Sequence, residues 1–64
     1  MNNITTVLEA ITKAGAGNSR IVEADGVWVI EVKVGGVWVP MIKDKSKVAM
    51  EGILKHGQNR IICG

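Results

Sequence analysis

Few side chains in this sequence can do covalent chemistry. The chain has one histidine, His56, one cysteine, Cys63, and six carboxylates scattered along its length. Nucleophilic catalysis needs a nucleophile beside a base that a third group orients, and no such set lies near His56 or Cys63 in the sequence. A metal site needs three or four ligands at workable spacing, which one His and one Cys do not supply. We therefore expect no enzyme activity, no metal and no cofactor.

Phosphate binding is a second chemistry that the residue types allow. The segment KDKSK, residues 43–47, leads into a predicted helix. Its lysines, with the backbone amides of the first helical turn, could hold a phosphate group. The net charge is only +2, which is too small to predict capture of nucleic acid by itself. Nucleic-acid binding through Lys43, Lys45 and Lys47 is therefore an alternative hypothesis, and a solvated charge run is the default one.

The first element is predicted as a helix over residues 4–14. Asn3 suits the N-cap, and Gly15 suits a left-handed stop. Between them, apolar residues recur at helical spacing. These apolar positions are Ile4, Val7, Leu8, Ile11 and Ala14.

Between Arg20 and Ile42 the period changes to that of strands, and Val and Ile dominate. Asp25-Gly26 and Gly35-Gly36 each indicate a two-residue hairpin turn, because such turns need positive φ angles that Gly and Asp tolerate. Three antiparallel strands are therefore predicted over residues 20–24, 27–34 and 37–42.

A second helix is predicted after a cap at Asp44 or Ser46, with a stop at Gly57. Gly52 lies inside it and costs about 1 kcal/mol relative to Ala, so we expect close packing against the sheet there. Residues 59–63 form a short segment with enough apolar residues to be predicted as a fourth strand at a sheet edge.

These elements give the order α-β-β-β-α-β and a single α+β domain over residues 1–64, with both helices on one face of the sheet. Such a short chain buries only about 60% of its unfolded surface. A single cysteine cannot form an internal disulfide. We expect a partner or self-association to supply further burial. No run approaches the roughly 18 apolar residues of a membrane span, and no targeting segment is evident, so the protein is predicted to be soluble and cytoplasmic.

The succession of a helix, a three-stranded meander and a helix is similar to that of double-stranded RNA-binding domains, which grip backbone phosphates with lysines at the start of the second helix. Those domains carry a denser lysine cluster and a longer, histidine-bearing loop between the first two strands, where this chain has only Asp25-Gly26. The comparison therefore covers the layout alone and assigns no family.

The two turns determine the faces of the predicted sheet. With Gly35-Gly36 as the bend, Lys33 lies opposite Trp38 and Ile30 opposite Met41, and partners across strands share a face. Trp28 is then predicted to be buried in the core, and Trp38 to stand on the outer face. The predicted core face holds Trp28, Ile30, Val32, Val34, Val37, Val39 and Met41.

The outer face combines charged residues with an apolar area on the order of several hundred Å², a size at which surface patches begin to indicate partners. Trp is the residue type most enriched in binding hot spots. Pro40 lacks an amide hydrogen and is expected at an edge strand or a bulge. The predicted partner-binding residues are Trp38, Pro40, Val29 and Ile42, with Arg20, Glu31 and Lys33 as a polar rim.

The preferred hypothesis is a small non-enzymatic binding protein, such as an inhibitor, an adaptor or a small subunit, that contacts another protein through this face. Small viral proteins that block host machinery belong to the same class. A homodimer that buries the outer face or joins strand edges is an alternative hypothesis, and nucleic-acid binding is a third. No membrane partner is expected.

Overall fold

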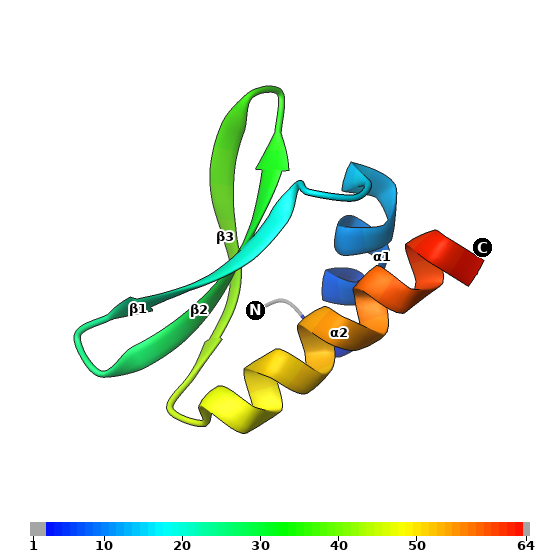
Figure 1. Ribbon diagram of the computed structural model, residues 1–64. Helices are drawn as coiled ribbons and strands as arrows, with labels where there is room; N and C mark the ends of the chain where they lie inside the picture. The colour runs from blue at the N-terminus through cyan, green and yellow to red at the C-terminus, as the bar shows by residue number, and fades with distance from the viewer. Residues whose placement is uncertain (1–2, 64) are drawn as a thin grey trace.

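A layer of two helices lies on one face of a three-stranded sheet in the computed structural model, which describes residues 3–63 and their side chains as far as Ile61. The strands are antiparallel in the order β1-β2-β3, and both helices lie on the same side of the sheet (Figure 1). This arrangement confirms the predicted α+β class. The elements are α1 (Ile4–Ala14), β1 (Ser19–Ala24), β2 (Val27–Val34), β3 (Val37–Asp44) and α2 (Lys47–Cys63).

Helix α1 begins and ends as predicted. The Asn3 side chain accepts a hydrogen bond from the backbone N–H of Thr6 at 2.8 Å, so Asn3 is the N-cap. Gly15 has a φ of +90°, and its N–H donates to the carbonyl oxygen of Ile11. The side-chain amide of Asn18 donates to the carbonyl of Ala14 at 2.7 Å and satisfies a second carbonyl at this helix end.

Both predicted hairpin turns are present. All four turn residues have positive φ angles, as two-residue hairpins of the primed type require. The values are 53° for Asp25, 77° for Gly26, 58° for Gly35 and 83° for Gly36. These local signals determine the three strands and the register next to each turn.

A β-bulge in β3 changes the register farther from the second turn. Glu31 lies opposite Pro40 as predicted, but Ile30 lies opposite Ile42 and not opposite Met41. Met41 is the additional residue of the bulge, and both Met41 and Ile42 pack against the core. The prediction that Ile42 points to the outer face is therefore wrong, because one extra residue reverses the face of the positions that follow it.

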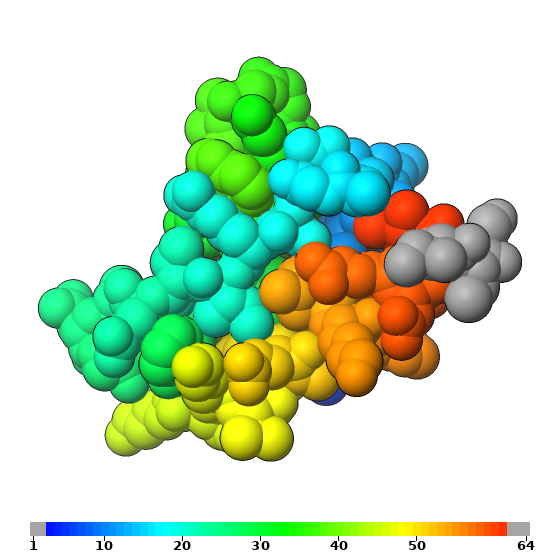
Figure 2. All heavy atoms as spheres, in the orientation of Figure 1, coloured from blue at the N-terminus to red at the C-terminus, as the bar shows by residue number. Residues whose placement is uncertain are grey.

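The core lies between the sheet and the two helices. Its fully buried side chains are Val7 and Ile11 of α1, Ile30 and Val32 of β2, and Met50 of α2. Partly buried hydrophobic side chains from every element pack around them. Figure 2 shows the atoms of β1 (cyan) lying against those of α2 (yellow to orange), so the two layers close over the core at this edge.

The tip of the β2–β3 hairpin extends beyond the helices (Figure 1). Val34 and Val37 are cross-strand partners next to the turn, and their exposed fractions are 55% and 62%. The prediction that these two valines belong to the buried core is therefore wrong, because no helix reaches far enough to cover them.

Helix α2 continues through Gly57 and includes residues 59–63. The predicted stop at Gly57 and the predicted fourth strand are therefore wrong. Gly57 is buried against α1, where an added Cβ would lie 2.8 Å from Cγ2 of Ile11. Gly57 thus permits the two helices to approach closely. Packing between the helices offsets the cost of a glycine in a helix, which is about 1 kcal/mol relative to Ala.

Gly52 does not have the packing role predicted for it. It is exposed, and nothing lies within 4 Å of an added Cβ. The start of α2 agrees with the sequence, because the Ser46 hydroxyl accepts a hydrogen bond from the N–H of Ala49 at 3.2 Å. Asp44, the other predicted cap, accepts from the N–H of Ser46 at 3.3 Å and so orients the cap residue.

Candidate functional site

The outer face of the sheet is the side opposite the helices, and neither helix of the described chain packs against it. Alternation along the strands and the observed register give its members. The outer face comprises Arg20, Val22 and Ala24 of β1, Val27, Val29, Glu31 and Lys33 of β2, and Trp38, Pro40 and Lys43 of β3. Six of the seven predicted partner-binding residues therefore share this face, and Ile42 does not.

Arg20, Glu31 and Trp38 form a connected group across all three strands. The Nε and Nη2 atoms of Arg20 both lie 2.8 Å from Oε1 of Glu31, directly across from it on β2. The guanidinium carbon of Arg20 lies 4.0 Å from the centroid of the Trp38 ring. The Nζ atom of Lys33, the cross-strand partner of Trp38, lies 5.9 Å from the same centroid.

This geometry restricts the conformations of the two largest side chains on the outer face. Glu31 is only 19% exposed and anchors the guanidinium, while Arg20 itself remains 45% exposed. An exposed salt bridge contributes about 0–1 kcal/mol, and an exposed cation–π contact about 0.5–1 kcal/mol. Arg20 and Trp38 are consequently held in place by contacts within the sheet itself.

The two tryptophans point to opposite faces, as predicted, but they differ less in burial than predicted. Both rings are half-buried. Trp28 packs against the edge of the core, and its cross-strand neighbours Glu23 and Asp44 are both exposed. The Nζ atom of Lys47 lies 4.9 Å from the Trp28 ring. The prediction that Trp28 is buried is therefore wrong: its ring packs at the edge of the core, beside charged side chains of β1, β3 and the first turn of α2.

Pro40 has both of the properties expected of a proline in a sheet. Strand β3 is an edge strand, and Pro40 immediately precedes the bulge residue Met41. A depression of about 260 Å³ beside Pro40 is lined by Val29, Pro40, Met41, Ile42 and Lys43. The depression at the bulge is therefore lined by three of the predicted partner-binding residues, Val29, Pro40 and Ile42.

The three lysines of the alternative nucleic-acid site lie in different surroundings. Lys43 is opposite Val29 on the outer face, while Lys47 lies over the ring of Trp28 on the core face. Lys45 is exposed in the connection between β3 and α2. Asp44 and the capping residue Ser46 separate these lysines along the chain. The structure does not gather them around one point, and their role in phosphate binding stays a prediction.

The bulge also moves Lys43 onto the outer face, which sequence analysis did not foresee. The signal in the sequence was Pro40, because a proline at a bulge implies a change of register in the residues that follow. Lys43 adds a third cation to a face whose described side chains include one carboxylate, that of Glu31.

Within residues 3–63, no three His, Cys, Asp or Glu side chains come close enough to hold a metal ion. The side chain of Cys63 lies outside the described residues. In the same part of the chain, neither helix has the length and apolar character needed to cross a membrane. No protein-family model, curated protein or solved structure matches the chain.

Proposed function

We propose that this chain is a small non-enzymatic binding protein whose outer sheet face contacts another protein. One arrangement carries the proposal: Trp38 stacks with Arg20, and Glu31 holds Arg20 in place, on a face against which neither helix packs. Trp and Arg are among the residue types most enriched in binding hot spots. Side chains that are ordered beforehand lose less conformational entropy on binding, which favours affinity.

The size of the chain suits an interface of ordinary extent. A standard interface covers about 800 Å² on each partner. That area is roughly a fifth of the 4279 Å² that this chain exposes. One face of a three-stranded sheet is a surface of this order, and the half-buried valines Val22, Val27 and Val29 supply an apolar centre for it.

The charges on the outer face favour an acidic partner surface. Arg20, Lys33 and Lys43 contribute three positive charges, and Glu31 contributes one negative charge that Arg20 already neutralises. Charge complementarity increases the association rate and selects against partners of the same sign. We infer that the contacted protein presents carboxylates around an apolar patch that receives Trp38.

Affinity capture from native lysate tests the proposed function. The wild-type chain, Trp38→Ala and Val48→Ala serve as three baits. Val48 is 79% exposed on α2, so its replacement removes apolar surface away from the outer face. We expect a protein that the wild-type and Val48→Ala baits retain and Trp38→Ala loses. Equal retention by all three baits would contradict a role for the outer face.

The two alternative functions have separate tests. A homodimer built on the outer face or on the strand edges requires self-association. A monomeric mass in light scattering at micromolar concentration would therefore rule out the homodimer. Nucleic-acid binding through Lys43, Lys45 and Lys47 requires retardation of a duplex at low salt and a steep loss of binding as salt rises. A cytoplasmic location and an inhibitory role toward host machinery stay predictions.

A further inference from the structure

Strand β1 presents a row of open backbone groups at one edge of the sheet. The carbonyl of Asn18, immediately before β1, accepts a hydrogen bond from the N–H of Lys33 on β2 at 2.8 Å, so the backbone of Asn18 faces β2. Backbone groups alternate in direction along an antiparallel strand. The residues whose N–H and C=O groups face outward are therefore Ser19, Ile21 and Glu23. Within the described residues, no hydrogen bond joins these outward groups to another part of the chain.

The opposite edge of the sheet, β3, disfavours pairing with a further strand. Val34 and Val37 flank the second hairpin turn as a hydrogen-bonded pair, so the backbone groups of Trp38 and Pro40 face outward. Pro40 has no N–H, and the bulge at Met41 follows it directly. A proline and a bulge are two features with which proteins protect edge strands. Strand β1 has neither of them, and its pairing with β2 is regular throughout.

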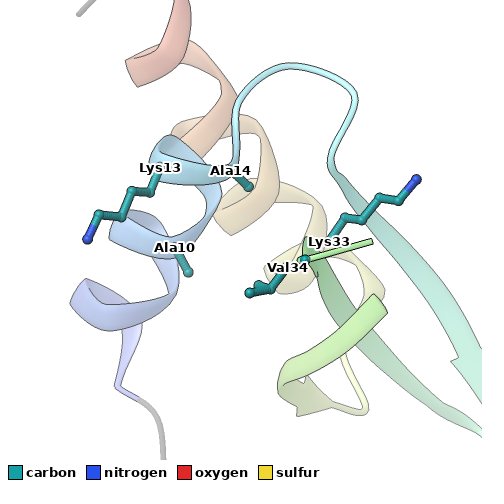
Figure 3. A pocket seen from close by; sticks show the side chains of 6 residues that line it. Ala10, Lys13, Ala14, Lys33 and Val34 are labelled. Carbon is teal, nitrogen blue, oxygen red and sulfur yellow. The ribbon is translucent and has the colours of Figure 1, made fainter. Parts of the chain in front are cut away.

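The open edge of β1 lies at the surface of the molecule. Its atoms (cyan) are visible above those of α2 (yellow to orange) in Figure 2, and Glu23 and Ala24 are exposed. A separate depression lies between α1 and the tip of the β2–β3 hairpin, where Ala10 and Ala14 face Val34 (Figure 3). None of the residues that line this depression belongs to β1. A strand added beside β1 therefore leaves it unchanged.

The sequence of β1 is complementary to a second copy of itself. A twofold axis perpendicular to the sheet at Ile21 places Ile21 opposite its own counterpart, and Ser19 opposite Glu23 of the second copy. These are the outward-facing residues, so each pair exchanges both of its backbone hydrogen bonds. Arg20 then lies opposite Val22 of the second copy, and no two like charges of β1 are directly opposite each other.

We propose that the protein forms a homodimer in which the β1 strands of two copies pair antiparallel, centred on Ile21, to make one continuous sheet. Each copy uses the one edge of its sheet that lacks a proline and a bulge. The assembly therefore closes at two copies and does not extend into a filament. A chain of this length buries only about 60% of its unfolded surface by itself, and the pairing of two copies adds to that burial.

The dimer goes beyond the proposed contact with another protein and does not depend on it. The twofold axis keeps both outer faces on the same side of the continuous sheet, so the Trp38 side chains of both copies stay available. Two identical contact points on one assembly increase the avidity for a partner that presents two sites.

Light scattering of the wild-type chain and two variants of one exposed residue tests the dimer. Glu23→Pro removes an outward N–H at a position where an edge strand tolerates proline, and Glu23→Thr removes the same carboxylate but keeps the N–H. We expect the wild-type chain and Glu23→Thr to dimerise with a dissociation constant of about 10 μM or below, and Glu23→Pro to dimerise at least about tenfold more weakly. A monomeric wild-type chain, or equal dissociation constants for the two variants, would overturn the proposal.

Hydrogen exchange of the wild-type backbone amides identifies the edge that pairs and does not depend on the folding of any variant. The N–H of Ile21 faces outward from β1, and that of Trp38 faces outward from β3. We expect exchange at Ile21 to slow roughly tenfold between about 1 μM and 1 mM protein, and exchange at Trp38 to stay the same. Exchange at Ile21 that does not depend on concentration, or slowing at Trp38 in its place, would contradict pairing through β1.

One further variant separates this dimer from the proposed function. Trp38→Ala should leave the dimer mass unchanged, because Trp38 does not belong to β1. Loss of the dimer in Trp38→Ala would place the contact between copies on the outer face and would overturn the pairing of β1 strands. Loss of partner capture with an intact dimer supports both proposals, and capture by a monomeric chain supports the proposed function alone.

Discussion

The guanidinium group of Arg20 stacks on the ring of Trp38 at 4.0 Å and thereby connects β1 with β3. These two strands are not hydrogen-bonded neighbours, because β2 lies between them. The contact therefore ties the two edge strands together on the outer face, while the core ties them together on the opposite face.

The energetic link between Arg20 and Trp38 is measurable in a double-mutant cycle. We expect a coupling free energy of unfolding of about 0.5–1 kcal/mol for the Arg20→Ala and Trp38→Ala pair. Urea unfolding followed by circular dichroism supplies the four stabilities. The Lys33→Ala and Trp38→Ala cycle is the control, and its coupling should be smaller because Lys33 lies 5.9 Å from the ring. Equal couplings in the two cycles would contradict this difference.

The bulge in β3 predicts opposite outcomes for two neighbouring positions. Ile42→Ala removes a side chain that packs against the core and should destabilise the protein by roughly 2 kcal/mol. Pro40→Ala changes an exposed outer-face residue and should cost less than about 1 kcal/mol. Thermal unfolding of the two variants checks this order. If Pro40→Ala lowers the stability more than Ile42→Ala does, we would conclude that β3 has a regular register and that Ile42 lies on the outer face.

Signals that operate over a few residues predicted much of this fold. Asn3 and Gly15 bound α1, and the two hairpin turns determine the pairing of the strands near them. The alternation of side chains between the two faces follows the prediction from each turn as far as the bulge. Beyond Met41 each residue lies on the face opposite to the predicted one. The sequence does not show whether a strand contains an extra residue, although Pro40 marks a position where a bulge is tolerated.

The length of α2 depends on contacts between residues that are distant in sequence. For this reason the predicted end of the helix at Gly57 was wrong. Gly57 resembles a helix stop in local sequence, but its role is defined by Ile11, which lies 46 positions earlier in the numbering. Gly52 shows the opposite case, because a glycine inside a helix suggested close packing and the structure shows open space. Propensity alone does not distinguish these two glycines.

Replacement of these two glycines by alanine should change the stability of the protein in opposite directions. Gly57→Ala forces a methyl group against Ile11, and such overpacking costs typically 1–3 kcal/mol. Gly52→Ala meets no obstacle and should stabilise the protein by about 0.5–1 kcal/mol through helix propensity. Denaturant midpoints of the two variants provide the comparison. Stabilisation by Gly57→Ala would show that α1 and α2 do not pack closely at this position.

The start of α2 depends on a single side-chain cap. Ser46→Ala removes the hydrogen bond to the N–H of Ala49 and should cost about 1 kcal/mol of stability. Ser46→Asp keeps an acceptor at the same position and should retain most of that stability. The melting temperatures of the two variants, measured by calorimetry, test this prediction. An equal decrease in melting temperature for both variants would rule out loss of the cap as the cause.

The candidate site was less predictable than the fold. Six of its predicted residues share the outer face because strand parity is reliable near the turns. One feature of the outer face comes from tertiary arrangement, because the bulge adds Lys43 to it. The contact of Arg20 with Trp38 also required coordinates, since it joins residues on strands that are not adjacent.

We propose above all that Trp38 and Arg20 form the contact point for a protein partner. Titration calorimetry of the captured partner against the wild-type chain, Trp38→Ala and Val48→Ala tests it most directly. We predict that Trp38→Ala raises the dissociation constant roughly 30-fold, a hot-spot loss of about 2 kcal/mol, while Val48→Ala changes it less than about twofold. A dissociation constant that is the same for Trp38→Ala as for the wild-type chain would contradict the claim.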